Sequence, residues 1–115
     1  MSLPLEGLKV LAFEQYGAGP FGSQYLSDLG AEVIKIEPAG TDGDYLRALG
    51  PYFIDEERNS ASSIFFQALN RNKKSITLNI LSGEGKEILG KLVKTSDAVC
   101  NNLRGCLLYT SDAAD

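Results

Sequence analysis

Short apolar runs alternate with helical patterns along most of this chain, and this alternation restricts the possible fold more than any other feature of the sequence. The runs have the length and composition of strands: "LKVLAF" (8–13), "AEVIKIE" (31–37), "KSITLN" (74–79) and "DAVCN" (97–101). Strands that alternate with helices favour a largely parallel sheet with right-handed crossovers. We therefore expect an α/β fold whose ligand site lies at the carboxyl ends of the strands.

Three helices are expected between these strands. Pro20 suits a first helical turn, and apolar residues recur after it at helical spacing: Phe21, Tyr25 and Leu29. The segment 60–70 predicts a second helix, and Ser82 caps a third that runs to about Thr95.

The second strand and the segment after it are expected to differ in character. Ile34 and Ile36 share one face of the strand, and Lys35 and Glu37 share the other. Residues 38–60 are rich in Gly, Pro, Asp and Arg and predict a long loop, a type that is often functional. Asp42 and Asp44 in this loop are interpreted as solvated turn residues.

Composition excludes several classes of function. A length of 115 residues allows one small domain, and a net charge of −4 gives no general attraction to nucleic acid or an anionic membrane. No apolar run approaches the roughly 20 residues that cross a bilayer. The chain has no histidine, and its cysteines, Cys100 and Cys106, form no metal motif. We expect a cytoplasmic protein without a metal, a membrane partner or a nucleic-acid partner.

The segment "GAGPFG" contains Gly17, Gly19 and Gly22 at the spacing G-x-G-x-x-G, which is typical of a loop that cradles a dinucleotide pyrophosphate. Glu37 ends the second strand near the place where a ribose-binding acid is expected. However, residues 14–16 separate the first strand from the first glycine, whereas in the dinucleotide fingerprint the strand runs almost directly into it. The spacing leaves three interpretations open: an NAD site, close helix-to-strand packing, or a site for another ligand that bears phosphate or adenine.

Two further polar segments lie beside strands. "NRNKKS" (70–75) places Arg71, Lys73 and Lys74 just before the third strand, where a solvated loop is the commoner role of such a cluster. "NNLRG" (101–105) follows the fourth strand, and its Arg104 has the planar donor geometry that binds a phosphate with two hydrogen bonds.

Taken in order, these segments resemble the N-terminal part of the class III CoA-transferases of the CaiB/BaiF type, a family that includes formyl-CoA transferase, carnitine CoA-transferase and α-methylacyl-CoA racemase. The blocks "AGPFGSQYLSDLGAEVIKIEP" and "NRNKKSITLNI" carry most of the resemblance, which covers residues 4–105. It implies that residues 1–105 are a Rossmann-like portion that binds coenzyme A rather than NAD. In this portion, a mainly parallel sheet has helices on both faces. The full-length protein is then an interlocked homodimer.

The resemblance also implies contacts with coenzyme A at the strand ends. Carried over by position, these contacts are Gly17, Ala18, Leu78, Asn79, Asn102, Leu103 and Arg104. Pro38 stands where some relatives have an arginine, and Leu81 stands where some have a lysine. Lys73 and Lys74 are therefore alternative ligands for the phosphates.

The activity implied by the resemblance is transfer of CoA from an acyl-CoA to a carboxylic acid. In family members with this activity, an aspartate carboxylate attacks the thioester, a mixed anhydride forms, and CoA passes to the acceptor. The position of that aspartate lies beyond residue 115, so no residue of this chain is predicted to be catalytic. Within the family, an acyl-CoA racemase is the alternative. Outside it, the alternatives are an NAD-dependent oxidoreductase and an inactive structural fragment.

The segment "CLLYTSDAAD" (106–115) breaks the pattern because it has neither a helical stripe nor a cap. We expect this segment to be a foreign tail. We also expect the chain as written to be poorly stable and to lack transferase activity, because its last strand presents an unpaired edge.

Overall fold

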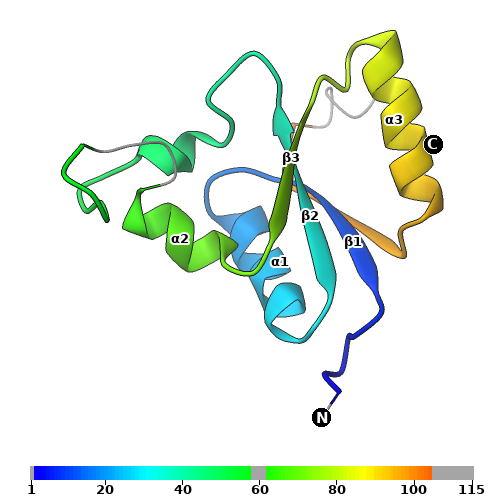
Figure 1. Cartoon of the computed structure of the whole chain (residues 1–115), viewed down its shortest axis with the longest axis horizontal. Coiled ribbons are helices and arrows are strands. Elements are labelled where there is room, and N and C mark those ends of the chain that lie inside the picture. The colour runs from blue at the N-terminus through cyan, green and yellow to red at the C-terminus, as the bar shows by residue number, and fades with distance from the viewer. Residues whose placement is uncertain (1, 58–61, 105–115) are drawn as a thin grey trace.

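The fold is an α/β sandwich, seen in a computed structural model that describes residues 2–57 and 62–104. Its strands are β1 (Lys9–Phe13), β2 (Glu32–Pro38), β3 (Lys74–Leu78) and β4 (Ala98–Asn101). All neighbouring strands pair in parallel, in the order β3-β2-β1-β4 (Figure 1). The predicted parallel α/β sheet is confirmed. The predicted tail, 106–115, lies outside the described residues.

The helices are α1 (Ala18–Asp28), α2 (Ile64–Asn70) and α3 (Gly83–Lys94), with a short 3-10 helix η1 (Tyr45–Ala48) in the loop after β2. Serine side chains cap the starts of α2 and α3. Ser63 Oγ accepts a hydrogen bond from the Phe66 N–H at 3.3 Å, and Ser82 Oγ accepts one from the Gly85 N–H at 3.0 Å. Ser82 was the predicted cap of the third helix. In the part of the chain that the structure describes, no helix is long and apolar enough to cross a membrane.

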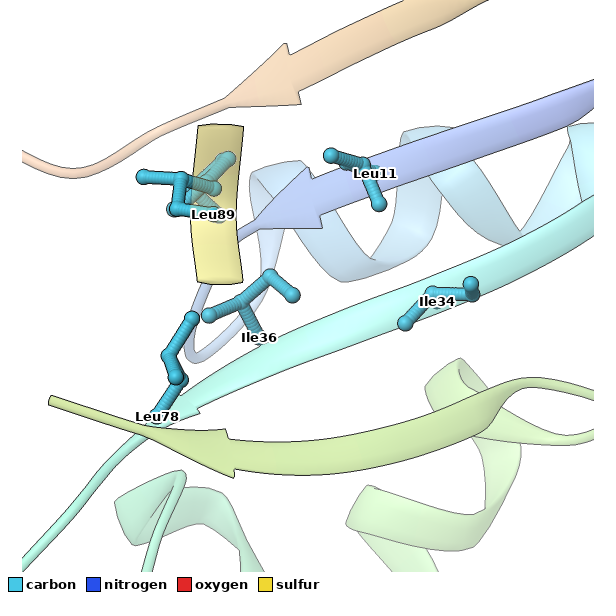
Figure 2. Packing of buried hydrophobic residues seen from close by; sticks show 6 residues of the cluster. Leu11, Ile34, Ile36, Leu78 and Leu89 are labelled. Atoms are coloured by element: carbon cyan, nitrogen blue, oxygen red, sulfur yellow. The ribbon is translucent and has the colours of Figure 1, made fainter. Parts of the chain in front are cut away.

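Helices cover both faces of the sheet, as predicted (Figure 1). On one face, Leu89 of α3 packs over alternate strand residues: Leu11, Phe13, Ile34, Ile36 and Leu78. Figure 2 shows this cluster and labels Leu11, Ile34, Ile36, Leu78 and Leu89. On the other face, Leu26 of α1 packs against Val10, Ala12, Ala31 and Val33. Because strand side chains alternate between faces, the two clusters use alternate residues of β1 and β2.

Helix α1 presents an unexpected face to the protein. Its buried residues are Pro20, Ser23, Gln24 and Ser27. Phe21 and Tyr25, which carry the helical spacing in the sequence, are 52% and 58% exposed. The reason is that α1 lies over buried polar groups: Ser23 Oγ donates a hydrogen bond to Glu14 at 2.6 Å, and Ser27 Oγ donates to the Asn72 carbonyl at 3.1 Å. The periodicity predicted the helix correctly, but apolarity did not identify its buried face.

Candidate functional site

The carboxyl edge of the sheet has the geometry of a ligand site. Strand β1 pairs with β2 on one side and with β4 on the other, so the chain changes direction across the sheet at β1. In open parallel sheets, ligands bind at the carboxyl edge where the strand order reverses in this way. The loops after β1 and β4 therefore border the predicted site.

Asn102 fastens these two loops together. Its side-chain Oδ1 accepts a hydrogen bond from the Gln15 N–H, and its Nδ2 donates one to the Gln15 carbonyl, both at 3.0 Å. Its own N–H donates to the Phe13 carbonyl at 3.0 Å. Asn102 is thus at the predicted edge, where its amide group holds the loop after β1 in place.

The three glycines of the G-x-G-x-x-G spacing do different things. A Cβ on Gly19 would lie 2.7 Å from Asn102 Cγ and 2.8 Å from Glu14 Cβ, so only glycine allows α1 to approach the strand ends this closely. A Cβ on Gly17 or Gly22 would meet nothing within 4 Å. Close helix-to-strand packing therefore explains Gly19, while Gly17 faces open space at the start of α1.

A cleft of ≈ 220 Å³ opens beside this loop, at the carboxyl ends of β1, β2 and β3. Three of the predicted contacts line it: Leu78, Asn79 and Leu103. Pro38 and Leu81, which stand where some relatives have a basic residue, line it as well. The lining of the cleft is mainly apolar, and it also includes the polar residues Glu14, Gln15, Glu37 and Asn79. A planar apolar group with polar substituents fits such a lining.

The other predicted contacts are accessible at this edge or beside it. Gly17 is half-buried, Ala18 is exposed, and Arg104 is exposed. Helix α1 begins at Ala18 with Gly17 as its N-cap, and no side chain of the described residues caps it. The first amides of α1 are thus free to donate hydrogen bonds to an anion.

Lys73, one of the two lysines predicted as alternative phosphate ligands, lies inside the protein. Its side chain is 2% exposed, and four oxygens lie within hydrogen-bond distance of its Nζ: Glu14 Oε1 at 2.8 Å, the Pro20 and Leu69 carbonyls at 2.9 Å, and Asn70 Oδ1 at 3.2 Å. Burial lowers the pKa of the Lys73 ammonium, and the hydrogen bond to Glu14 opposes that effect. These contacts engage the donors of this ammonium and give Lys73 a structural role inside the protein, while its role as a phosphate ligand stays a prediction.

Lys74, the other lysine of this prediction, lies on the surface. It begins β3, in register with Ile34 of β2, whereas the cleft lies at the other end of β3, beyond Leu78. Its side chain is 70% exposed, and its Nζ lies 3.6 Å from Glu32 Oε1 at the start of β2. Lys74 thus lies near the amino end of the strands, away from the cleft, and its role as a phosphate ligand stays a prediction.

A buried network of charges beneath the glycine loop was not predicted from the sequence. It consists of Glu14, Lys35, Asp44 and Lys73. Lys35 Nζ lies 2.8 Å from Asp44 Oδ2, in an ion pair without hydrogen-bond geometry, and 3.6 Å from Glu14 Oε1. Asp44 is 1% exposed, so its interpretation as a solvated turn residue is wrong. The charges of Lys35 and Glu37 mark the polar face of β2 in the sequence, but nothing there shows that residues 43–47 and α2 cover this face.

Glu37 anchors the loop after β2. Arg47 donates two hydrogen bonds to its carboxylate, at 2.8 and 2.6 Å, the Asp44 N–H donates a third at 2.8 Å, and the Ser75 hydroxyl donates a fourth. Burial by itself raises the pKa of the Glu37 carboxyl, but these hydrogen bonds, led by that of Arg47, lower it to about 2. Arg47 also lies over the Phe66 ring, 4.2 Å from its centroid.

The lowered pKa of Glu37 predicts a loss of stability in acid. A carboxyl whose pKa is lower in the folded state stabilises the fold above its unfolded pKa, and this contribution disappears as the pH falls through the folded value. The free energy of unfolding therefore falls between about pH 5 and about pH 2, and Glu37 accounts for about 2–3 kcal/mol of this loss. We expect urea denaturation to show that Glu37→Gln loses less unfolding free energy than the original chain between pH 7 and pH 3. Equal pH dependence in the two proteins would contradict this account of Glu37.

Comparison with known proteins gives a consistent result. Residues 5–108 match the model of CoA-transferase family III. The chain is 43% identical over 99 residues to the human succinyl-CoA:glutarate CoA-transferase, a match that covers 86% of this chain and 21% of the relative. It is 41% identical over 102 residues to the formyl-CoA:oxalate CoA-transferase of Escherichia coli O139:H28, covering 89% of this chain and 23% of that enzyme.

Solved structures agree with the sequence relatives. A CAIB/BAIF family protein from Brucella suis superposes with a TM-score of 0.84 at 41% identity, over 96% of this chain and 29% of that one. The hypothetical protein Rv3272 from Mycobacterium tuberculosis superposes with a TM-score of 0.80 at 35% identity, over 96% of this chain and 28% of that one. The chain thus spans about a quarter of the length of these proteins and corresponds to their N-terminal part. The chain belongs to CoA-transferase family III.

Proposed function

We propose that this chain is the coenzyme-A-binding part of an enzyme that transfers CoA between an acyl-CoA and a carboxylic acid. The observation that carries the proposal is the cleft at the carboxyl edge, because Leu78, Asn79 and Leu103 line it together although Leu103 is distant from the other two in the sequence. Its apolar lining suits the adenine of CoA. The free amides at the start of α1 and the exposed Arg104 suit its phosphates.

The relatives support the reaction class. The human and Escherichia coli relatives are both CoA-transferases by name, and they differ in the acids they use. Since the chain covers about a quarter of each, the nucleophilic aspartate is proposed to lie in the remaining part of the full-length protein. The described residues provide a place for the coenzyme, and the choice of donor and acceptor acids is left to other parts of the enzyme.

Two further properties belong to the proposal. We infer that the full-length protein is a homodimer, because α1 and α2 expose the large apolar side chains of Phe21, Tyr25, Ile64 and Phe65, and exposed apolar patches mark interaction surfaces. We infer that it works in the cytoplasm, because the reaction uses soluble CoA esters and the sequence has no disulfide pattern.

A charge placed in the cleft tests the proposal. Leu81 lines the cleft and is 51% exposed, so Leu81→Glu should leave the fold intact and repel the phosphates of CoA. We expect titration calorimetry to show CoA binding to the original chain, with affinity at least about tenfold weaker in Leu81→Glu. Ile88→Glu is the matched control: Ile88 is similarly exposed, at 47%, but lies on α3 outside the cleft lining.

Two outcomes of this experiment contradict the proposal. If Leu81→Glu and Ile88→Glu both bind CoA as the original chain does, the coenzyme does not occupy this cleft. If the original chain binds NAD and not CoA, the dinucleotide interpretation of the glycine loop replaces the present one.

A further inference from the structure

Tyr16, the residue before the first glycine, has an unusual backbone conformation. Its φ is 67°, in the left-handed region that bulky residues rarely adopt. A tyrosine stays in this region only where the surrounding structure holds it there, and such residues cluster at functional sites. Contacts with the surrounding structure must therefore hold Tyr16 in this conformation.

Among the described residues, two contacts hold Tyr16, and both come from the loop after β2. The Tyr16 N–H donates a hydrogen bond to Asp44 Oδ1 at 3.2 Å. The Tyr16 ring stacks on the ring of Tyr45, with 5.4 Å between centroids and 10° between planes. Tyr16 and Tyr45 are 48% and 53% exposed, so this stack lies on the surface and is not part of the core.

The loop that makes these contacts is itself firmly anchored. Asp44 Oδ1 also accepts the Leu46 N–H at 3.0 Å, which caps η1, and the Asp44 N–H donates to Glu37 Oε1 at 2.8 Å. Lys35 forms the ion pair with Asp44 Oδ2. A continuous set of contacts thus runs from β2, through Asp44 and Tyr45, to Tyr16.

Tyr16 is followed directly by Gly17, the N-cap of α1, so its backbone sets the direction in which the first turn of α1 faces. Asn102 fixes the preceding residue, Gln15, from the other side. We propose that Tyr16 and Tyr45 are positioning residues of the coenzyme site: their stack holds the glycine loop so that the first amides of α1 face the phosphates of CoA. This inference rests on the proposed function.

The test removes the stack without touching the cleft or the core. In Tyr45→Ala, we expect the affinity for CoA to fall by up to about tenfold, the scale of one aromatic pair, while the melting temperature changes little. Tyr45→Phe keeps the stack and should bind CoA as the original chain does. Tyr52→Ala, which removes a 73% exposed tyrosine outside the cleft lining and the stack, should also leave affinity unchanged.

A second variant tests the coupling between the two rings. Tyr16→Gly removes the other ring and tolerates the left-handed backbone without strain. If the stack is the operative contact, Tyr16→Gly combined with Tyr45→Ala should bind CoA no more weakly than the weaker single variant. Full affinity in folded Tyr45→Ala, or strictly additive losses in the double variant, would overturn the inference.

The inference and the proposed function can fail separately. If the original chain does not bind CoA, the proposed function fails for this chain, and the position of the loop is then judged from backbone amide chemical shifts. Shifts of the Gly17, Ala18 and Gly19 amides in Tyr45→Ala, absent in Tyr45→Phe, support the role of the stack in holding the loop. Identical spectra for these amides in the original chain and Tyr45→Ala contradict it.

Discussion

Replacing Glu14 with alanine is expected to lower the free energy of unfolding by about 3–5 kcal/mol, the cost of leaving buried partners uncompensated. The Glu14 carboxylate lies 2.8 Å from Lys73 Nζ and 3.6 Å from Lys35 Nζ, and all three side chains are almost completely buried. Glu14→Ala leaves the two ammonium groups with the single carboxylate of Asp44 nearby. It also removes the acceptor of the Ser23 hydroxyl.

Urea denaturation followed by circular dichroism measures this loss. A small domain is stable by only about 5–15 kcal/mol, so a loss of this size removes a large fraction of the stability of the chain. Glu32→Ala is the matched control, because Glu32 pairs with Lys74 at 3.6 Å on the surface, where such a pair contributes about 0–1 kcal/mol. Equal losses in Glu14→Ala and Glu32→Ala would show that the buried network is not a main source of stability.

Replacing Gly19 with alanine is expected to destabilise the chain by about 1–3 kcal/mol, the range for overpacking a tight contact. The added methyl group would lie under 3.0 Å from both Asn102 and Glu14. Asn102 holds the loops after β1 and β4 together, and Glu14 pairs with the buried Lys73. The substitution therefore pushes α1 away from the strand ends and disturbs the candidate site as well as the packing.

Gly22→Ala provides the control within the same motif and the same helix. A Cβ there meets nothing within 4 Å, and alanine favours the helix over glycine by up to about 1 kcal/mol, so Gly22→Ala should be neutral or stabilising. The unfolding free energies of both variants test whether close packing explains Gly19. If Gly19→Ala is as stable as Gly22→Ala, close packing does not explain the central glycine of the motif.

Much of the fold follows from local patterns in the sequence. The β-type runs predicted every strand of the described residues to within one position at either end, and Ser82 marked the start of α3. These features depend on neighbouring residues, so the sequence expresses them directly. The resemblance of the ordered blocks predicted the edge of the sheet that carries the candidate site, and three of its residues line one cleft.

The features that the sequence did not predict depend on contacts between residues that are far apart in the chain. Lys73 reads as a surface charge in "NRNKKS", but Glu14, 59 residues earlier in the chain, accepts its hydrogen bond inside the protein. Asp44 reads as a turn residue, but it receives the Tyr16 N–H from a loop 28 residues earlier in the chain. Phe21 and Tyr25 follow the helical period, yet both are exposed. Polar side chains of α1 are buried instead, because this helix covers charged groups. Pairings of this kind leave no periodic signal in the sequence.

The central claim is that coenzyme A binds at the carboxyl edge of this sheet. The most direct test is a titration of the isotopically labelled chain with CoA, followed through the backbone amide resonances. The account predicts that the largest shifts fall on Gly17, Ala18, Leu78, Asn79 and Leu103, while the amides of α3 around Leu89 stay in place. The absence of shifts at the strand ends, or shifts confined to the exposed faces of α2 or α3, would contradict it.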